Sequence, residues 1–365
     1  MTIAGCLALR LAAAPALRDG LSAVVQIGPS LWLANDETTG LERLVLQVNP
    51  ADGSIAYAQH VRFPLQNFLS LPVPAKAGAE DGDEIDIEGL AFSGQYLWLV
   101  GSHSLKRKKV KAGKSASENI KRLQKVSRDD NRFLLARIPV DVATAIPGLE
   151  RTLDLNGTSL QAAQLAPAPE GNVLMQALAD DPHLQDFLVI PGKDNGFDIE
   201  GLAVVGERLL VGLRGPVLRG WAILLELETV LDAKDPTRLQ LKPMEADGQL
   251  YRKHFLQLGG LGIRELCVQG NDLLIMAGPS MDLDGPVHIY RWEGGARPAE
   301  ASVVKAEQLQ HVIAVPYGQG DDHAEGMCLY QTVAGEVHLL LVYDSASAQR
   351  KQGDDTVLAD LFTLS

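Results

Sequence analysis

The sequence is poor in cysteine and has no long apolar run, and both absences narrow what the protein can be. Its three cysteines, Cys6, Cys267 and Cys328, are odd in number and lack CxxC spacing, which fits a reducing compartment and argues against a disulfide framework or a zinc site. No run of about 18 apolar residues, the length needed to span a bilayer, is present. A hydrophobic content of 46% indicates instead a globular protein with a substantial core.

Positive charge is also scarce. The chain has 33 Lys and Arg against 46 Asp and Glu, a formal net charge of −13, which argues against nucleic acid or a membrane as the main partner because both attract cationic surfaces. Residues 105–128, the basic segment, are the exception, with ten Lys and Arg and a single acid, Glu118. Three interpretations stay open: a solvated loop, a lid that attracts anionic substrates, or an arm that binds nucleic acid or an acidic partner.

The N-terminal stretch MTIAGCLALRLAAAPA resembles the apolar part of a signal peptide. It has no basic residues at its start, and Arg10 interrupts the apolar run, so we interpret it as a strand. The expected location is the cytoplasm. Export is the alternative if a signal has been removed.

A hexapeptide, DIEGLA, occurs at residues 86–91 and again at 198–203. Related segments begin at Gly20, Gly262 and His323, and each of the five copies reads as a strand, a Gly-containing turn and a second strand, the signature of a β-hairpin. A third β-rich run follows every hairpin. Four of the five units then end in a fourth run, which starts at Asn67, Asp186, His254 or His311.

The leftover apolar segment that begins at Cys6 can complete the last unit, which removes an open sheet edge in the manner of a β-propeller. We therefore predict an all-β fold: one β-propeller domain over residues 1–365, with five four-stranded blades closed by the N-terminal strand. Inserts with helical pattern are expected at 105–130 and 156–184. Six blades are the alternative if the second insert hides one.

In a propeller the first strand of each blade lines a central channel, so the third repeat position predicts a ring of side chains: Ser22, Glu88, Glu200, Arg264 and Glu325. The residue two positions before a ring residue lies on the same face of the strand and should join the ring. In three of the first strands this residue is polar: Asp86, Asp198 and His323. Strand two of each hairpin ends at the same channel mouth. Its last residues include Asp36, His103, Arg214 and Asp344, and Lys193 is a further candidate ligand contact.

The ring has a structural and a functional interpretation. Arg264 can balance the glutamates as a buried charge network. The excess of acids can instead raise carboxylate pKa values or recruit a cation. In that case Glu88, Glu200, Glu325, Arg264 and His103 are candidate catalytic groups. The candidate ligands for Ca²⁺ or Mg²⁺ are Asp86, Glu88, Asp198, Glu200 and Glu325.

Other motifs are weaker. Ser22 lacks the GxSxG context of a nucleophile that His103 or His323 would activate. Cys267 and Cys328 stand at a repeat position that favours small residues, so packing explains them. Asp282 and Asp284 lack the spacing of a calcium loop and indicate a turn.

The segment GKDNGFDIEGLAV at 192–204, together with DIEGLAF, GIREL and HAEGM, resembles a bacterial family, the domain of unknown function 3616, over nearly the whole chain. More distantly, the E-G strands resemble the propeller family called esterase-like activity of phytase. That resemblance implies a propeller that hydrolyses phosphate esters or other esters. Glu88, Glu200 and Glu325 match its pattern, whereas Ser22 and Arg264 depart from it.

Two functional hypotheses follow. In the first, the channel mouth is a divalent-cation-dependent hydrolase site for a phosphate ester or other ester, or it binds a small anion. In the second, the protein is a non-enzymatic scaffold that binds a protein partner through the mouth and the basic segment, and the charge ring is structural.

Overall fold

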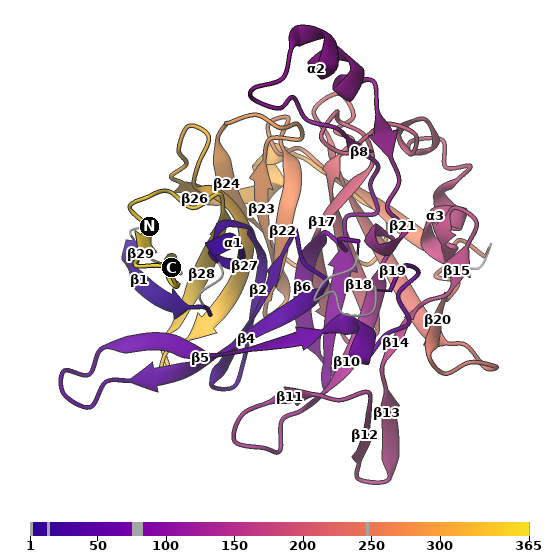
Figure 1. Cartoon of the computed structure of the whole chain (residues 1–365). Helices are drawn as coiled ribbons and strands as arrows, with labels where there is room; N and C mark the ends of the chain where they lie inside the picture. The colour runs from indigo at the N-terminus through magenta and orange to yellow at the C-terminus, as the bar shows by residue number, and fades with distance from the viewer. Residues whose placement is uncertain (1–2, 13–14, 75–82, 246–247, 365) are drawn as a thin grey trace.

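The computed structural model describes residues 3–12, 15–74, 83–245 and 248–364, and strands dominate them (Figure 1). The all-β class is confirmed. Among the described residues there are three α-helices, all short: α1 (Pro15–Asp19), α2 (Ala116–Leu123) and α3 (Val173–Leu178). None of the described helices is long and apolar enough to cross a membrane.

Each of the five predicted hairpins is an antiparallel strand pair. In chain order they begin the first to fifth units of the fold. They are β2 (Leu21–Ile27) with β3 (Ser30–Asn35), β6 (Ile87–Ser93) with β7 (Tyr96–Gly101), β17 (Asp198–Val205) with β18 (Arg208–Gly215), β22 (Gly262–Gln269) with β23 (Asp272–Gly278), and β27 (His323–Gln331) with β28 (Val337–Asp344).

A third strand pairs with strand two of every hairpin, and a fourth strand pairs with the third. The third strands are β4 (Gly40–Val48), β10 (Leu135–Asp141), β19 (Ala222–Leu231), β24 (Val287–Trp292) and β30 (Thr356–Thr363). The fourth strands are β5 (Ile55–Pro64), β14 (Ala163–Leu165), β21 (Tyr251–Leu256), β26 (Leu309–Val315) and β1 (Ile3–Arg10).

Two of the four predicted fourth runs are wrong. The first unit uses β5, and the chain after it enters the 3₁₀ turn Leu65–Asn67. The second unit uses β14, which pairs with β10, while the run that starts at Asp186 includes the 3₁₀ turn Gln185–Phe187. In both places the apolar run packs without pairing with a neighbouring strand. Its apolar composition alone therefore did not predict whether it forms a strand. The runs at His254 and His311 do lie in strands.

The N-terminal strand completes the last unit, as predicted. β1 runs antiparallel to β30, with Cys6 opposite Asp360, and its other edge pairs in parallel with β5 of the first unit. The two ends of the chain therefore lie in one sheet (Figure 1).

The five first strands contact one another in a closed cycle, near the middle of Figure 1: β2 with β6, β6 with β17, β17 with β22, β22 with β27, and β27 with β2. Glycines permit this close approach. A Cβ on Gly89 would lie 2.7 Å from the Cβ of Leu202, and a Cβ on Gly201 would lie 2.9 Å from Cγ of Leu266. The Gly of the repeated E-G pair is thus a packing requirement between neighbouring first strands.

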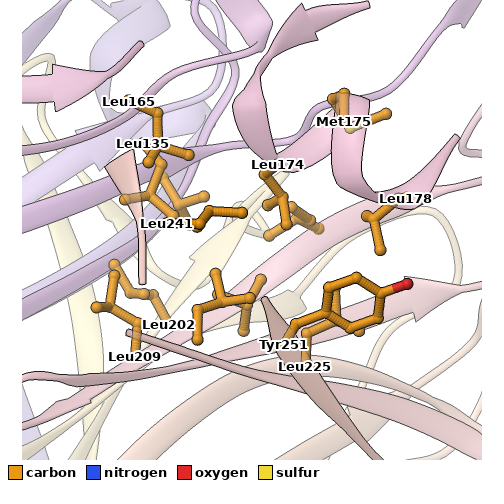
Figure 2. Close-up of a cluster of buried hydrophobic side chains, with 14 of the residues drawn as sticks. Leu135, Leu165, Leu174, Met175, Leu178, Leu202, Leu209, Leu225, Leu241 and Tyr251 are labelled. Atoms are coloured by element: carbon orange, nitrogen blue, oxygen red, sulfur yellow. The ribbon is translucent and has the colours of Figure 1, made fainter. Parts of the chain in front are cut away.

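Each pair of neighbouring units in this cycle shares a cluster of buried apolar side chains. Between the second and third units, α3 adds Leu174, Met175 and Leu178, which lie opposite Leu225 and Tyr251 in Figure 2. Burying a side chain of this kind contributes about 1.5–3 kcal/mol relative to exposure. These clusters hold the sheets in a ring and fix the position of the strand ends at its centre.

The longer connections carry the remaining elements. The basic segment holds a two-stranded ribbon, β8 (Lys106–Arg107) with β9 (Val126–Ser127), and α2, which projects at the top of Figure 1. The hairpin of β12 (Thr152–Leu155) and β13 (Thr158–Gln161) projects at the opposite end. The other short elements are β11 (Gly148–Leu149), β15 (Pro167–Ala168), β16 (Gly171–Asn172), β20 (Arg238–Leu241), β25 (Val303–Val304), β29 (Lys351–Gln352) and the 3₁₀ turns Asp130–Arg132 and Ala306–Gln308.

Candidate functional site

The third repeat position lies in a β-bulge in all five first strands. In every hairpin the ladder advances two residues on strand one against one residue on strand two at this point. The extra residue of a bulge is left out of the ladder, and the bulge re-aims its side chain. The residues so placed are the predicted ring: Ser22, Glu88, Glu200, Arg264 and Glu325.

Arg264 ties three units together at the channel mouth. Its Nε lies 2.7 Å from Oε2 of Glu200, and its Nη2 donates to Glu325. On the far side of Glu200, Nη1 of Arg214 lies 2.8 Å from Oε1. Arg214 also donates to the carbonyl oxygens of Pro279 and Met281, which fixes the loop after β23. Glu200 is therefore held by two guanidinium groups.

A second ion cluster, built on Arg132, borders the same mouth. Its Nη2 lies 2.6 Å from Glu84 and its Nη1 lies 3.0 Å from Asp86. Its Nη1 also donates to the Ser104 hydroxyl. Sequence analysis missed Arg132 and Glu84, because both lie outside the repeated segments and no local pattern links them to the mouth.

Two buried ring carboxyls have no ion pair with a described residue. Glu88 is 8% exposed, and burial, followed by repulsion from Asp86 and Glu200, raises its pKa well above the ordinary value. Asp198 is 3% exposed; burial and Glu200 raise its pKa to about 7 although Arg214 opposes the shift. Glu88 therefore tends to stay protonated in the folded protein, whereas Asp198 titrates near neutral pH.

Two further carboxyls at the mouth titrate near neutral pH. Burial, with repulsion from Glu325 and Asp344, raises the pKa of Asp36 to about 8. Burial also raises the pKa of Glu325 to about 7, against the opposing effect of Arg264. The mouth is consequently less negative at neutral pH than its formal charges indicate.

Two predicted site residues, His103 and Ser22, are buried and form hydrogen bonds inside the protein. His103 is 2% exposed; its Nδ1 donates to the Gly101 carbonyl at 2.7 Å and its Nε2 accepts from the Asn172 amide at 2.8 Å. Burial lowers the pKa of His103 to about 4, so the ring is neutral. The Ser22 hydroxyl donates to the carbonyl of Ile87 at 2.5 Å. Neither side chain is available to a ligand.

A small cavity of about 100 Å³ opens at the mouth, between the loop after β23 and the start of β27. Four cationic side chains line it, and they come from the basic segment, the Lys193 loop, β18 and β22. Three acids, an imidazole, a phenol and a serine hydroxyl complete its polar lining. The polar residues are Lys109, Lys193, Arg214, Arg264, Asp282, Glu325, Asp344, His323, Tyr317 and Ser345.

The basic segment lies over this cavity. Arg107 Nε lies 2.6 Å from Oδ2 of Asp194, and Lys109 Nζ lies 3.7 Å from Oδ2 of Asp282. The carbonyl of Leu105 accepts a hydrogen bond from the Gly192 amide. The segment is thus attached to two of the loops that surround the mouth.

The five predicted metal ligands do not converge. Within the described part of the chain, no group of three or more His, Cys, Asp or Glu is placed to hold a metal ion. Arginines pair with three of the five: Arg264 pairs with Glu200 and Glu325, and Arg132 pairs with Asp86. The guanidinium of Arg264 provides the positive charge that a bound cation was expected to provide.

The comparison with family models gives one match. The model described as "Protein of unknown function (DUF3616)" matches residues 20–360. This confirms the resemblance that the repeated segments indicated. No curated protein matches the sequence.

Three solved structures are similar to the chain at low identity. The PQQ-bound aldose sugar dehydrogenase of Streptomyces coelicolor is 12% identical, with a TM-score of 0.33 over 98% of each chain. The putative oxidoreductase (glucose dehydrogenase) of Thermus thermophilus is 11% identical, with a TM-score of 0.35 over 98% of this chain and 100% of its own. The Nup133 β-propeller domain of Vanderwaltozyma polyspora is 10% identical, with a TM-score of 0.30 over 93% of this chain and 71% of its own. Scores this low assign no cofactor, substrate or partner to this chain.

Proposed function

For this chain, which belongs to the DUF3616 family, we propose that the channel mouth binds a small anionic ligand through a carboxylate or phosphate group. The observation that carries the proposal is the lining of one small cavity by four cations, Lys109, Lys193, Arg214 and Arg264. We take the fold to be a propeller of five blades, one for each first strand in the cycle, with the cavity at the end of its channel.

Two of these cations have donors to offer. Arg264 uses Nε and Nη2 in its ion pairs, and its Nη1 has no hydrogen bond among the described residues. Lys193 has no ion pair within the described ranges. Desolvation and the nearby charge of Arg214 act to lower the pKa of Lys193, but the carboxylates of Glu325 and Asp86 outweigh them and raise that pKa, so the amine stays charged. A guanidinium and an ammonium that line the same cavity suit a carboxylate or a phosphate.

The acids around the cavity do not prevent anion binding. Glu325 has a pKa of about 7 and takes up a proton readily when a negative charge arrives beside it. The ion pair of Lys109 is also weak, since Lys109 and Asp282 are 3.7 Å apart on an exposed surface. An incoming anion can therefore replace the contact between Lys109 and Asp282 at little cost.

The volume of the cavity limits the ligand group. The cavity volume of about 100 Å³ is several times the space that one water molecule needs. A carboxylate or phosphate group fits this space, and the remainder of a larger ligand would extend toward the basic segment.

Protein binding is a second candidate function, and one observation favours it. Helix α2 buries none of its residues, and four apolar side chains of the basic segment are exposed; they are Val110, Ile120, Leu123 and Val126. Apolar groups among ten cations suit an acidic partner with an apolar face.

Calorimetric titration with succinate and with inorganic phosphate tests the anion site. We expect saturable binding of at least one of the two, weakened at least tenfold in Lys193→Met. Lys305→Met removes an exposed lysine outside the mouth and serves as the matched control. If neither anion binds, or if Lys193→Met binds like the unaltered protein, the proposed function is wrong.

A further inference from the structure

A histidine and an aspartate form a fixed pair at the edge of the anion cavity. Nε2 of His323 lies 3.0 Å from Oδ1 of Asp284, and the same oxygen accepts the backbone N–H of Gly320 at 3.0 Å. Asp284 belongs to the loop between β23 and β24, and His323 begins β27. His323 lines the cavity, and Asp284 lies behind it, between the lining residues Leu283 and Gly285.

The hydrogen bond to Asp284 determines which ring nitrogen of His323 carries the proton. A carboxylate only accepts hydrogen bonds when ionised, so Nε2 of His323 carries the proton and Nδ1 is left as the acceptor. The hydrogen bonds from Gly320 and His323 lower the pKa of Asp284, which keeps it ionised. Nδ1 of His323 has no hydrogen bond among the described residues, in contrast to both ring nitrogens of His103.

We propose that His323, oriented by Asp284, is a general base that activates a water molecule for hydrolysis of a carboxylic ester whose acid part carries a second negative charge. The inference rests on the proposed anion site, because that site holds the charged end of the substrate beside the imidazole. Asp284 acts as a positioning residue. It contacts neither the water nor the ester.

The reaction needs no further reagent. His323 Nδ1 takes one proton from the water while the water oxygen bonds to the ester carbonyl carbon, giving a tetrahedral oxyanion. The C–O bond to the alcohol then breaks, and the same proton passes from His323 to the departing oxygen. The products are an alcohol and a carboxylic acid, which loses its proton to solvent.

The cations of the cavity serve this reaction twice. Lys193 and Nη1 of Arg264 can bind the carboxylate of the substrate, and the positive charge of Arg214, which lines the same cavity, stabilises the negative charge that develops on the carbonyl oxygen. A neutral ester of the same size lacks the first contact. The site should therefore prefer an anionic ester over its neutral counterpart.

The experiment follows hydrolysis by proton NMR with two ethyl esters, monoethyl succinate and ethyl butyrate, which have similar size and differ in charge. We expect the intact protein to hydrolyse monoethyl succinate at least tenfold faster than ethyl butyrate. A general base contributes about 10²–10⁴-fold, so His323→Asn should lower kcat at least a hundredfold. Asp284→Asn should lower kcat and leave KM nearly unchanged. His311→Asn alters an exposed histidine on β26 and should change neither.

The possible failures are separable. If succinate binds in the calorimeter but monoethyl succinate is not hydrolysed, or if His323→Asn retains full activity, the catalytic inference is overturned and the anion site stands. If neither succinate nor inorganic phosphate binds, the proposed function fails as well. Equal rates on the two esters would overturn the substrate preference.

Discussion

Arg264 and Glu200 occupy the same repeat position in neighbouring units, and their side chains meet 2.7 Å apart at the channel mouth. The five bulges direct the third repeat position of each first strand out of the ladder, so one arginine in the cycle can pair with two glutamates. The substitution of one repeat position by Arg thus changes a set of acids into a paired charge network.

Removing Arg264 should lower the stability of the protein, because its glutamate partners lose the positive charge that it supplies. Arg264→Ser gives the fourth unit the residue that the first unit has in Ser22 and leaves Glu325 without its cation. Breaking a buried ion pair costs about 3–5 kcal/mol, so we expect a clear fall in the urea midpoint. Because the ring then holds hydroxyl and carboxylate oxygens alone, Ca²⁺ should restore part of the loss. Unfolding with and without Ca²⁺ measures both effects, and the unaltered protein, in which Arg264 supplies the charge, should not respond to Ca²⁺.

The raised carboxyl pKa values predict a pH dependence of stability. Asp36 has a folded pKa of about 8, whereas its unfolded value is near 4. Between these values the Asp36 carboxyl binds more protons in the folded state than in the unfolded state, so the stability that it contributes is greatest below pH 4 and is lost as pH rises toward 8. Asp198 and Glu325, at about 7, act in the same direction.

Asp36→Asn should flatten this dependence by up to about 1.4 kcal/mol per pH unit. Urea unfolding at intervals from pH 5 to pH 9 measures it. Asp186→Asn, at an exposed aspartate outside the mouth, is the control and should leave the slope unchanged. A slope in Asp36→Asn equal to that of the unaltered protein would contradict the predicted coupling.

The basic segment should contribute to ligand binding and little to folding. Lys108 N donates to the carbonyl of Lys125, so a two-residue glycine turn can replace residues 109–124 and keep the β8–β9 ribbon. Since α2 buries nothing, we expect the free energy of unfolding to change by no more than about 0.5 kcal/mol. Anion affinity should fall because Lys109 is lost from the cavity. The point variant Lys109→Met removes this amine alone, so its anion affinity separates the effect of Lys109 from the effect of losing residues 109–124.

A methyl group at the repeated glycine should destabilise the ring of first strands. In Gly89→Ala the new Cβ would lie 2.7 Å from Cβ of Leu202 and 3.1 Å from Cγ1 of Val100. Overpacking of this kind costs about 1–3 kcal/mol, measurable by urea unfolding. Gly148→Ala is the matched control, because nothing lies within 4 Å of its Cβ position. Equal stability of the two variants would show that the first strands can separate to admit the methyl group.

Much of the fold could be predicted because its signals are local. Period-two apolar runs and glycine turns set the five hairpins, and the repeat itself aligned the ring residues. The fourth strands were harder, since the runs at Asn67 and Asp186 are as apolar as true strands. Whether such a run joins a ladder depends on which neighbour has a free edge.

The candidate site was predicted in position more than in chemistry. Glu200 and Glu325 lie at the mouth, yet they are paired with arginines and gather no metal site among the described residues. His103 precedes the basic segment in the sequence, and tertiary packing buries it against Asn172. His323 gains its orienting partner from another loop, at Asp284.

The sequence by itself determined the repeated hairpin and the side chain that each repeat offers to the ring, because backbone periodicity and glycine spacing act over a few residues. Only the tertiary structure decided which charges meet: Arg264 with Glu200, Arg132 with Asp86, and His323 with Asp284. Charge pairing depends on distances of a few ångströms between residues that lie far apart along the chain. Those distances exist only once the first strands have closed into a ring.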